Sequence, residues 1–329
     1  MRSPLGSAVA ALILVGTSAA CAREQSSTEP RRDSNADCAT APIAAYTLET
    51  GIGGGVYRLA VVRPEEDPVL LFRDLVVHSP SISPDGKRVA VVYAHGDYES
   101  GGPDYEELWI IDIADMTVDV VEVHDGAPFF SSPDWSLDGS TIAFVHGQVG
   151  DRAIRLYDVG TGSSTQLALT PGFEGSLAWS PDGSRLAFIA NEKGEGGARR
   201  WFVEVLRRDG KRLHRIDIAT RAVGLAWHPD GETVLVAVPN EYEGTQVTLV
   251  NVEFESARVE PITDNDRYLA AAWSLGKRSW ALRVDEDGAA LVRVDLERPM
   301  AESDAIDLNI EGHWPADPGG RMFSLGPCA

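Results

Sequence analysis

The sequence predicts an all-β protein built from one repeated four-stranded sheet, and three observations support this. A unit made of an apolar strand, a Ser-Pro-Asp-Gly turn and a second apolar strand recurs along the 329-residue chain, most clearly at Ser176–Asn191. The turn glycines recur at intervals of 44 to 53 residues. Two further strand-like runs accompany each unit. A period of this length is typical of a four-stranded blade arranged around a central axis.

The turn residues explain why the chain reverses in each copy. Pro presets φ at the first turn position, Asp can bond the neighbouring backbone, and Gly takes the position with positive φ. The expected product is a tight hairpin with a one-residue bulge. The turn glycines are Gly86, Gly139, Gly183, Gly231, Gly276 and Gly320, the last two in the most altered copies.

The strand after each turn is almost continuously apolar, which predicts burial of both of its faces between neighbouring sheets. These second strands are Val89–Val92, Ile142–Val145, Leu186–Ile189 and Val234–Val238. The third strands are Val56–Val62, Leu108–Ile113, Ile154–Val159, Trp201–Leu206, Val247–Val252 and Ala290–Val294. The outer strands are Val69–Arg73, Val118–Val123, Thr165–Leu169, Arg212–Ile216, Arg258–Ile262 and Ala305–Ile310.

The order of these strands predicts how the sheets are closed into a ring. The first third-and-outer pair precedes the first hairpin, and the last hairpin, near Trp314–Leu325, has no strands after it. One blade is therefore expected to combine both ends of the chain, which leaves no open sheet edge. Ile43–Glu49 and Met322–Leu325 compete for the second position of that blade. The sequence thus predicts a six-bladed β-propeller over residues 43–329.

The repeat also resembles a known family. The pattern Trp-Ser-Pro-Asp-Gly-x-x-Leu/Ile-Ala-Phe is similar to the WD-like repeats of TolB-type six-bladed propellers, and the resemblance covers about Ile43–Cys328. It implies an envelope protein that binds protein partners, although other relatives carry unrelated sites on the same ring. TolB has an additional amino-terminal domain, whereas only a tether is expected here, so a TolB role does not transfer with the fold. Pro-Asp-Gly is intact at Ser83–Gly86, Ser180–Gly183 and His228–Gly231, whereas Ser136–Gly139 has Leu for Pro and Ser274–Gly276 has lost the Asp.

The amino terminus has the pattern of an export signal. One Arg precedes an apolar core at Ala8–Gly16 and then small residues, so residues 1–20 are interpreted as a signal peptide. Ser18-Ala-Ala-Cys21 resembles the bacterial lipoprotein processing box, with Ser18 departing from the usual large aliphatic residue. We expect a lipid on Cys21, the alternative being ordinary cleavage after Ala20 or Ala22. Residues 21–42 are polar and are interpreted as a disordered tether.

The cysteine count fits this interpretation. The chain has three cysteines, and an odd number in an exported protein needs an explanation, which a lipid on Cys21 supplies. The other two, Cys38 and Cys328, lie at opposite ends of the folded region, and the ends of a ring must meet. A Cys38–Cys328 disulfide would lock the closure in an oxidising compartment. Two unrelated thiols are the alternative.

The net charge of the chain restricts the kinds of partner that it can bind. The chain carries 29 Lys and Arg against 50 Asp and Glu, a net charge of −21. This argues against nucleic acid or an anionic membrane surface as the main partner. A solvated acidic surface is the simplest interpretation.

Candidate binding residues lie in the loops that lead into each inner strand, on the face opposite the Pro-Asp-Gly turns. Propeller sites usually form on that face, which is an argument from the fold alone. Converging His and carboxylate side chains could hold a divalent metal or a small ligand. The alternative is a hydrated channel mouth. The candidates are His78, His124, Asp125, Glu174, Arg221, Asp266, Arg267, Tyr268 and His313.

Other motifs are weaker. Asp264–Asp266 and Asp285–Gly288 suggest calcium loops but lack the full pattern, so turns are the better interpretation. The insertion His95–Glu107 lengthens one loop and is either a recognition loop or a solvated excursion. No nucleophile elbow or phosphate loop is present in the sequence.

These observations favour a monomeric, lipid-anchored binding propeller of the bacterial envelope that recognises a protein or glycan and needs no cofactor. The alternative is a propeller lyase or hydrolase that uses His78, His124, His313 and Asp266. That alternative requires at least two of these side chains about 4–5 Å apart around one bound atom.

Overall fold

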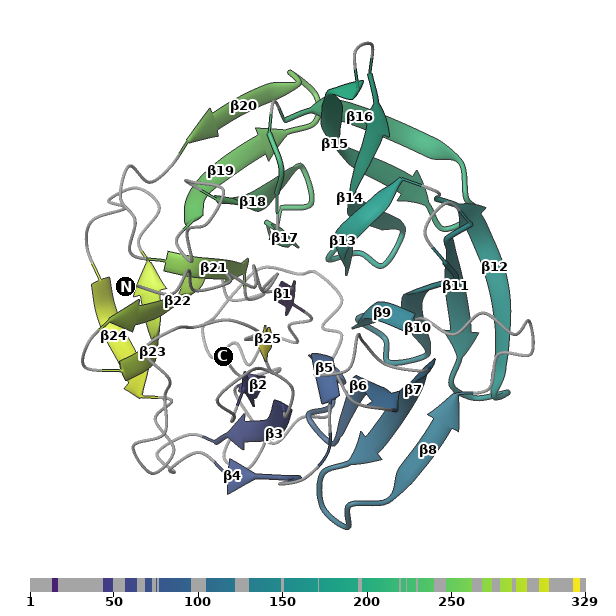
Figure 1. Ribbon diagram of the computed structural model, residues 1–329, viewed down its shortest axis with the longest axis vertical. Helices are drawn as coiled ribbons and strands as arrows, with labels where there is room; N and C mark the ends of the chain where they lie inside the picture. The colour runs from purple at the N-terminus through teal and green to yellow at the C-terminus, as the bar shows by residue number, and fades with distance from the viewer. Residues whose placement is uncertain are drawn as a thin grey trace, which may run out of the picture.

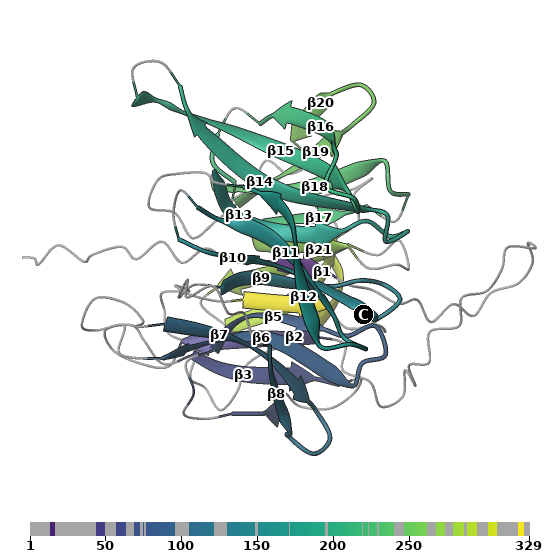
Figure 2. The same cartoon turned by 90° about the vertical axis from the view of Figure 1, so that its right-hand side faces the viewer.

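The computed structural model describes most of the repeat region. The described residues are 14–16, 44–49, 57–63, 69–72, 75, 77–95, 105–121, 130–148, 151–170, 172–194, 197–218, 220–222, 224–228, 230–239, 247–261, 268–273, 279–285, 288–294, 302–307 and 322–325. They form an all-β protein whose sheets stand side by side around a centre (Figure 1). Figure 2 shows the same ring from its edge. Within the described residues, no helix is long and apolar enough to cross a membrane.

Three sheets each contain four antiparallel strands in sequence order. The first consists of β5 (Val77–Ile82), β6 (Arg88–His95), β7 (Tyr105–Asp112) and β8 (Val118–Val121). The second consists of β9 (Phe130–Trp135), β10 (Thr141–His146), β11 (Ala153–Asp158) and β12 (Ser163–Leu169). The third consists of β13 (Phe173–Trp179), β14 (Arg185–Lys193), β15 (Arg199–Arg207) and β16 (Arg212–Asp217).

A fourth sheet holds eight strands, and two halves of it repeat the same four-strand order. One half consists of β17 (Gly224–Trp227), β18 (Thr233–Pro239), β19 (Val247–Glu253) and β20 (Arg258–Pro261). The other consists of β21 (Tyr268–Trp273), β22 (Ser279–Asp285), β23 (Gly288–Val294) and β24 (Glu302–Asp307). A single residue pair, Val247 with Tyr268, joins the two halves.

The fifth sheet combines both ends of the chain. Its order is β1 (Leu14–Gly16), β25 (Met322–Leu325), β2 (Ala44–Glu49), β3 (Tyr57–Val62) and β4 (Val69–Leu70). The β25 strand is antiparallel to β2, with Ala44 opposite Leu325. The run Ile43–Glu49 therefore supplies the strand beside β3, and Met322–Leu325 lies inward of it, which decides between the two competing segments.

The β1 strand comes from the predicted signal peptide. It pairs in parallel with β25, with Leu14 opposite Phe323, and lies near the centre of the ring in Figure 1. The other residues of the predicted leader and the tether lie outside the described residues, so the division into leader, tether and propeller stays a prediction.

The turns form as the sequence predicts. The backbone N–H of Gly183 donates to the carbonyl of Ser180 at 2.8 Å, and Gly183 has a φ of 67°. The hydroxyl of Ser180 donates to Asp182 at 2.5 Å, and Asp182 in turn accepts from the N–H of Ser184. Burial alone would raise the pKa of Asp182, but the hydrogen bonds from Ser180 and Ser184 outweigh it and hold the pKa below its ordinary value.

The core lies between the sheets. In β6, Val89 and Val91 pack toward β3 in one cluster, whereas Ala90 and Val92 pack toward β10 in another. All four are fully buried. The prediction that second strands are buried on both faces is therefore confirmed.

A tryptophan at the end of each of three inner strands connects consecutive sheets. The indole N–H of Trp135 donates to the carbonyl of Ser81 at 3.1 Å. Trp179 makes the same contact with Asp134 at 3.2 Å, and Trp227 makes it with Ala178 at 3.0 Å. These buried donors fix each sheet against the one before it.

An arginine side chain packs over each of these three indole rings. Two of the arginines follow a turn glycine, and the third comes from another turn. Arg88 lies 4.7 Å from the centre of Trp135, and Arg185 lies 5.0 Å from that of Trp227, each two residues after a turn glycine. Thr141 occupies the equivalent position before Trp179. There Arg208, from the hairpin that follows β15, covers the ring at 5.2 Å and donates to the Thr141 hydroxyl at 2.8 Å. The cation–π contact at Trp179 is thus made by a residue of the turn between β15 and β16.

Candidate functional site

The best-defined polar contact on the loop face, the face opposite the Pro-Asp-Gly turns, lies between the first two four-stranded sheets. His78 lies on β5, and its Nε2 is 3.1 Å from Oε1 of Glu106 at the start of β7. The other carboxylate oxygen accepts the backbone N–H of Phe130, the first residue of β9, at 2.9 Å. The side chains of His78 and Glu106 are 14% and 8% exposed. Glu106 therefore ties together three strands from two sheets.

Both ring nitrogens of His78 are engaged. Its Nδ1 lies 3.1 Å from the hydroxyl of Ser79, which has a positive φ of 54° and is fully buried. Neighbouring Phe130 packs on the His146 ring at 4.5 Å between centres. The imidazole of His78 thus connects Glu106 of β7 to the buried Ser79 of β5.

A second group of side chains, the aromatic stack, lies on the other face of the same hairpin. Tyr93 stacks on Trp109 at 4.0 Å, and His95 stacks on Tyr105 at 4.0 Å. Tyr93 and His95 meet edge to face at 4.4 Å, which joins the two pairs. Tyr105 is 44% exposed. Half-exposed aromatic rings of this kind are typical of recognition surfaces.

Glu107 anchors the stack. It accepts the indole N–H of Trp109 at 2.8 Å and lies 3.0 Å from Nε2 of His95. Burial alone would raise the pKa of Glu107, but the contacts with His95 and Trp109 outweigh it and lower the pKa below its ordinary value. The carboxylate is therefore ionised at neutral pH.

The His78–Glu106 contact and the aromatic stack both lie where the predicted insertion His95–Glu107 begins and ends. The structure corrects the bounds of this insertion. The strands β6 and β7 pair as far as His95 opposite Tyr105, so both ends of the range His95–Glu107 belong to strands. The hairpin is longer than predicted because Tyr93, His95, Tyr105, Glu107 and Trp109 contact one another across the two strands on one face. Residues 96–104 lie outside the described residues.

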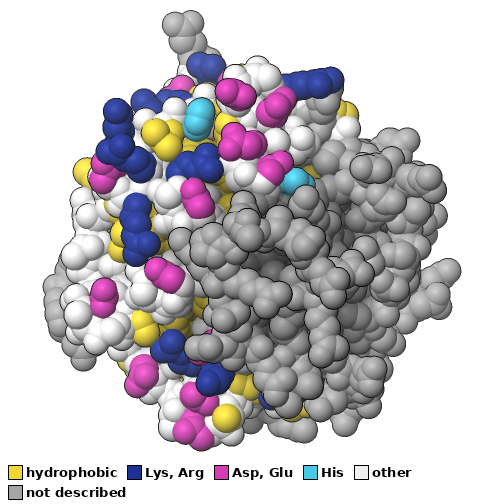
Figure 3. Space-filling model, turned by 180° about the vertical axis from the view of Figure 1, so that it is seen from behind, with side chains coloured by type: hydrophobic (Ala, Val, Ile, Leu, Met, Phe, Trp, Pro, Cys, Tyr) yellow, Lys and Arg dark blue, Asp and Glu magenta, His cyan; other side chains and the backbone are white. Residues whose placement is uncertain are grey.

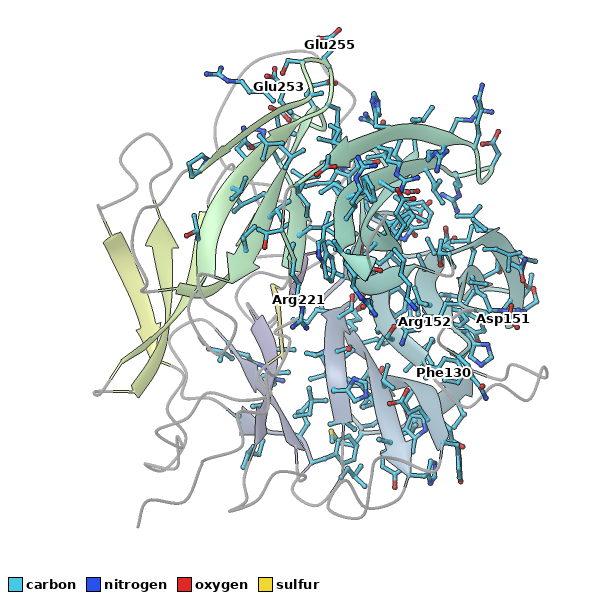
Figure 4. The ribbon with its side chains drawn as sticks, turned by 45° about the horizontal axis from the view of Figure 1, so that its top comes forward. Phe130, Asp151, Arg152, Arg221, Glu253 and Glu255 are labelled. Carbon is cyan, nitrogen blue, oxygen red and sulfur yellow. The ribbon has the colours of Figure 1, made fainter. Side chains whose placement is uncertain are left out.

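Arg221 is the other predicted site residue whose side chain is described. It is exposed and lies in the segment before β17. Figure 4 shows it toward the middle of the ring, with Arg152 and Phe130 nearer the rim. His78 and Arg221 are thus the predicted candidates that can be placed, and they come from different sheets.

The side chains of the remaining candidates lie outside the part of the chain that the structure describes. Glu174 and Tyr268 lie on β13 and β21, where only the backbone is described. Among described residues, no group of three or more His, Cys, Asp or Glu is placed to hold a metal ion. His124, Asp125, Asp266, Arg267, His313, Cys21, Cys38 and Cys328 lie outside the described residues.

Two carboxylates were missed by the sequence reasoning. Glu106 falls within the predicted insertion His95–Glu107 and was not among the candidate binding residues. Asp134 is fully buried on β9, and its Oδ2 accepts the backbone N–H of Trp179 at 2.7 Å. Burial raises the pKa of Asp134 well above its ordinary value, although the Trp179 N–H opposes this. Its signal in the sequence was an Asp directly before the repeat tryptophan Trp135, where the copies at Trp179, Trp227 and Trp273 have Ala.

Comparison with known proteins agrees with this geometry. A model of the TolB beta propeller domain matches residues 101–304, more than half of the chain. The chain belongs to this family. No curated protein matches the sequence.

Solved structures show the same fold at low identity. TolB from Acinetobacter baumannii is 17% identical with a TM-score of 0.59, over 86% of this chain and 66% of that one. A putative TolB from Agrobacterium tumefaciens is 16% identical with a TM-score of 0.56, over 82% and 89%. Hydrazine synthase from Kuenenia stuttgartiensis is 13% identical with a TM-score of 0.62, over 88% and 47%. The chain thus spans just under two thirds of the first of these proteins and less than half of the last.

Proposed function

We propose that this protein is a lipid-anchored, extracytoplasmic binding propeller that recognises a protein or glycan through its loop face. Membership of the TolB beta propeller family supports a binding or scaffold role. The observation that carries the proposal is the half-exposed Tyr105 ring, held on the loop face by stacking on His95. Glu106, on the opposite face of the same hairpin, contacts His78 on β5 and accepts the Phe130 N–H of β9, which fixes the strand ends there.

The proposal includes six blades. The two halves of the eight-stranded sheet repeat the same strand order and meet through one residue pair, so we count them as two blades. The sheet that joins β25 to β2 is the blade that closes the ring. A Cys38–Cys328 disulfide would reinforce this closure and contribute about 3–5 kcal/mol on the chain-entropy model.

Attachment to a membrane is tested by labelling with a radioactive fatty acid. Label is expected in the wild-type chain expressed in bacteria and absent from the Cys21→Ala variant. Equal labelling of both proteins, or of neither, would remove the lipid anchor from the proposal.

Recognition through the loop face is tested with a photo-crosslinking amino acid placed at Tyr105. A matched probe at Val120, on the outer strand β8, is the control because the two side chains are 44% and 46% exposed. In cells that express the protein natively, one discrete adduct is expected from position 105 and none from 120. Adducts from position 120 alone would overturn the assignment to this face.

A further inference from the structure

The third four-stranded sheet has an electrostatic character opposite to that of the rest of the chain. The segment that forms this sheet, residues 173–217, contains nine Lys and Arg and seven Asp and Glu, a net charge of +2. The remainder of the chain has 20 basic and 43 acidic residues, a net charge of −23. Such a local reversal focuses a positive field that attracts anionic partners.

The sheet is also the one that projects furthest. Its strands β14 and β15 have nine residues each, and Figure 2 shows this hairpin extending beyond the neighbouring sheets. Seen from behind, Lys and Arg side chains gather at the upper left, where this sheet lies (Figure 3). Lys193, Arg199 and Arg200, which lie toward the end of this hairpin, are exposed.

The arginines on one face of this sheet are held in fixed positions. Arg200 donates to Asp217 at 2.9 Å, and Arg215 donates to Glu192 at 2.6 Å. The Arg215 guanidinium also lies 3.7 Å from the centre of the Phe202 ring. Held guanidinium forks suit bidentate contacts with carboxylates, because little rotamer freedom remains to be lost on binding.

The outer strand adds a backbone surface. Among the described residues, β16 pairs with β15 on one side and with no strand on the other. Leu213 on this strand is 40% exposed, and the Arg212 side chain is 54% exposed and lies 3.6 Å from Glu204. An exposed strand edge that carries Arg212, Leu213 and Arg215 fits an extended segment.

We propose that the outer edge of the β13–β16 sheet binds an extended, carboxylate-rich segment of an acidic partner protein. This surface is separate from the loop-face contacts of His78 and Tyr105, so it goes beyond the function proposed above. Glu192, Glu204 and Asp217 lie among the arginines and would repel a dense anionic bilayer. A single extended segment can instead place its acids opposite the arginines alone.

Protection of the strand edge from aggregation does not account for this composition. Charged residues on an edge do discourage unwanted pairing. The equivalent strands achieve this without a basic cluster, since β8 (Val-Asp-Val-Val) carries one acid and β12 (Ser-Ser-Thr-Gln-Leu-Ala-Leu) carries no charge.

The test uses a fluorescein-labelled twelve-residue peptide of alternating Glu and Val and its Gln-for-Glu counterpart, with binding followed by anisotropy. The wild-type mature protein is expected to bind the Glu peptide and not the Gln peptide, and to bind more weakly in 200 mM than in 50 mM NaCl. Arg212→Glu should weaken binding about tenfold. Lys87→Glu, an equal charge reversal at an exposed turn of the first sheet, should change it less than about twofold.

Other outcomes overturn the proposal. Equal weakening by Arg212→Glu and Lys87→Glu would show a general charge effect. Binding to phosphatidylglycerol vesicles without binding to the peptide would assign the surface to a membrane. Self-association at low salt that Arg212→Glu abolishes would assign it to a second copy of the chain. Circular dichroism of both variants excludes loss of folding as the cause, and the crosslinking at Tyr105 reads out the loop face independently.

Discussion

The two faces of the ring are built on different principles. On the turn face, four copies repeat the same arrangement, with glycine φ values between 67° and 73° and a Gly N–H bonded to the residue three positions earlier. On the loop face, contacts such as the Phe130 N–H bond to Glu106 or the stacking of His95 on Tyr105 have no counterpart in the described part of the other sheets. The contacts that recur in every turn are those that the fold requires. Contacts found in one sheet alone are those that can give this chain a specific function.

The largest expected change in stability comes from a substitution among the repeated contacts of the turn face. Trp179→Ala removes a ring that is 4% exposed, its hydrogen bond to Asp134 and its contact with Arg208. The free energy of unfolding in urea should fall by about 3–5 kcal/mol. Trp109→Ala on the loop face removes a half-buried ring and should cost about 1–2 kcal/mol. Similar losses for the two variants would mean that both faces contribute equally to the fold.

Asp134 should make the folded protein less stable as pH rises, which is the reverse of the effect of most carboxylates in folded proteins. Because burial raises its pKa in the folded protein, the folded state binds a proton that the unfolded state releases above its ordinary pKa of about 4. Stability from this group should therefore fall as pH rises from 4, by up to about 1.4 kcal/mol per pH unit until the folded pKa is passed.

Asp134→Asn keeps an acceptor for the Trp179 N–H and removes the titration. Unfolding free energies of wild type and variant at pH 4 to 7 should therefore diverge, with the variant gaining relative stability as pH rises. Parallel curves would show that Asp134 is not protonated in the folded protein.

The aspartates of the turns should have the reverse effect, so that their contribution to stability is lost as pH falls. Hydrogen bonds lower the pKa of Asp182 in the folded state, so its contribution is present above the unfolded pKa and is lost as pH falls through the folded pKa. Asp182→Ala leaves Ser180 and the Ser184 N–H without their acceptor and should cost about 1–2 kcal/mol near neutral pH. Chemical denaturation at pH 7 and pH 3 checks this, and a cost that is equal at both values would contradict it.

The turn face was predictable from the sequence because short local motifs determine its structure. Pro-Asp-Gly determines the turn, and the apolar run after it determines a buried strand, so the strands from β5 to β20 begin and end within a few residues of the predicted bounds. The contact of Arg208 with Trp179 was not predictable, because it replaces the missing arginine at Thr141 from the turn after β15, which is 67 residues away from Thr141.

The loop face was predicted only in part. The position of His78 follows from strand order alone. Its partner Glu106 was assigned to a loop because the sequence does not show that β6 and β7 keep pairing as far as His95 and Tyr105. Register across a long hairpin depends on side-chain pairs that meet only in the folded sheet.

The central claim is that the turn face carries the fold and the loop face carries recognition. The most direct test is the yield of the Tyr105 crosslink per folded molecule in two variants of comparable expected stability. His78→Ala removes the contact with Glu106 and should cost about 1–2 kcal/mol, as Asp182→Ala does. We expect His78→Ala to lower the adduct yield severalfold and Asp182→Ala to leave it unchanged. Equal yields in the two variants, or a loss confined to Asp182→Ala, would contradict the claim.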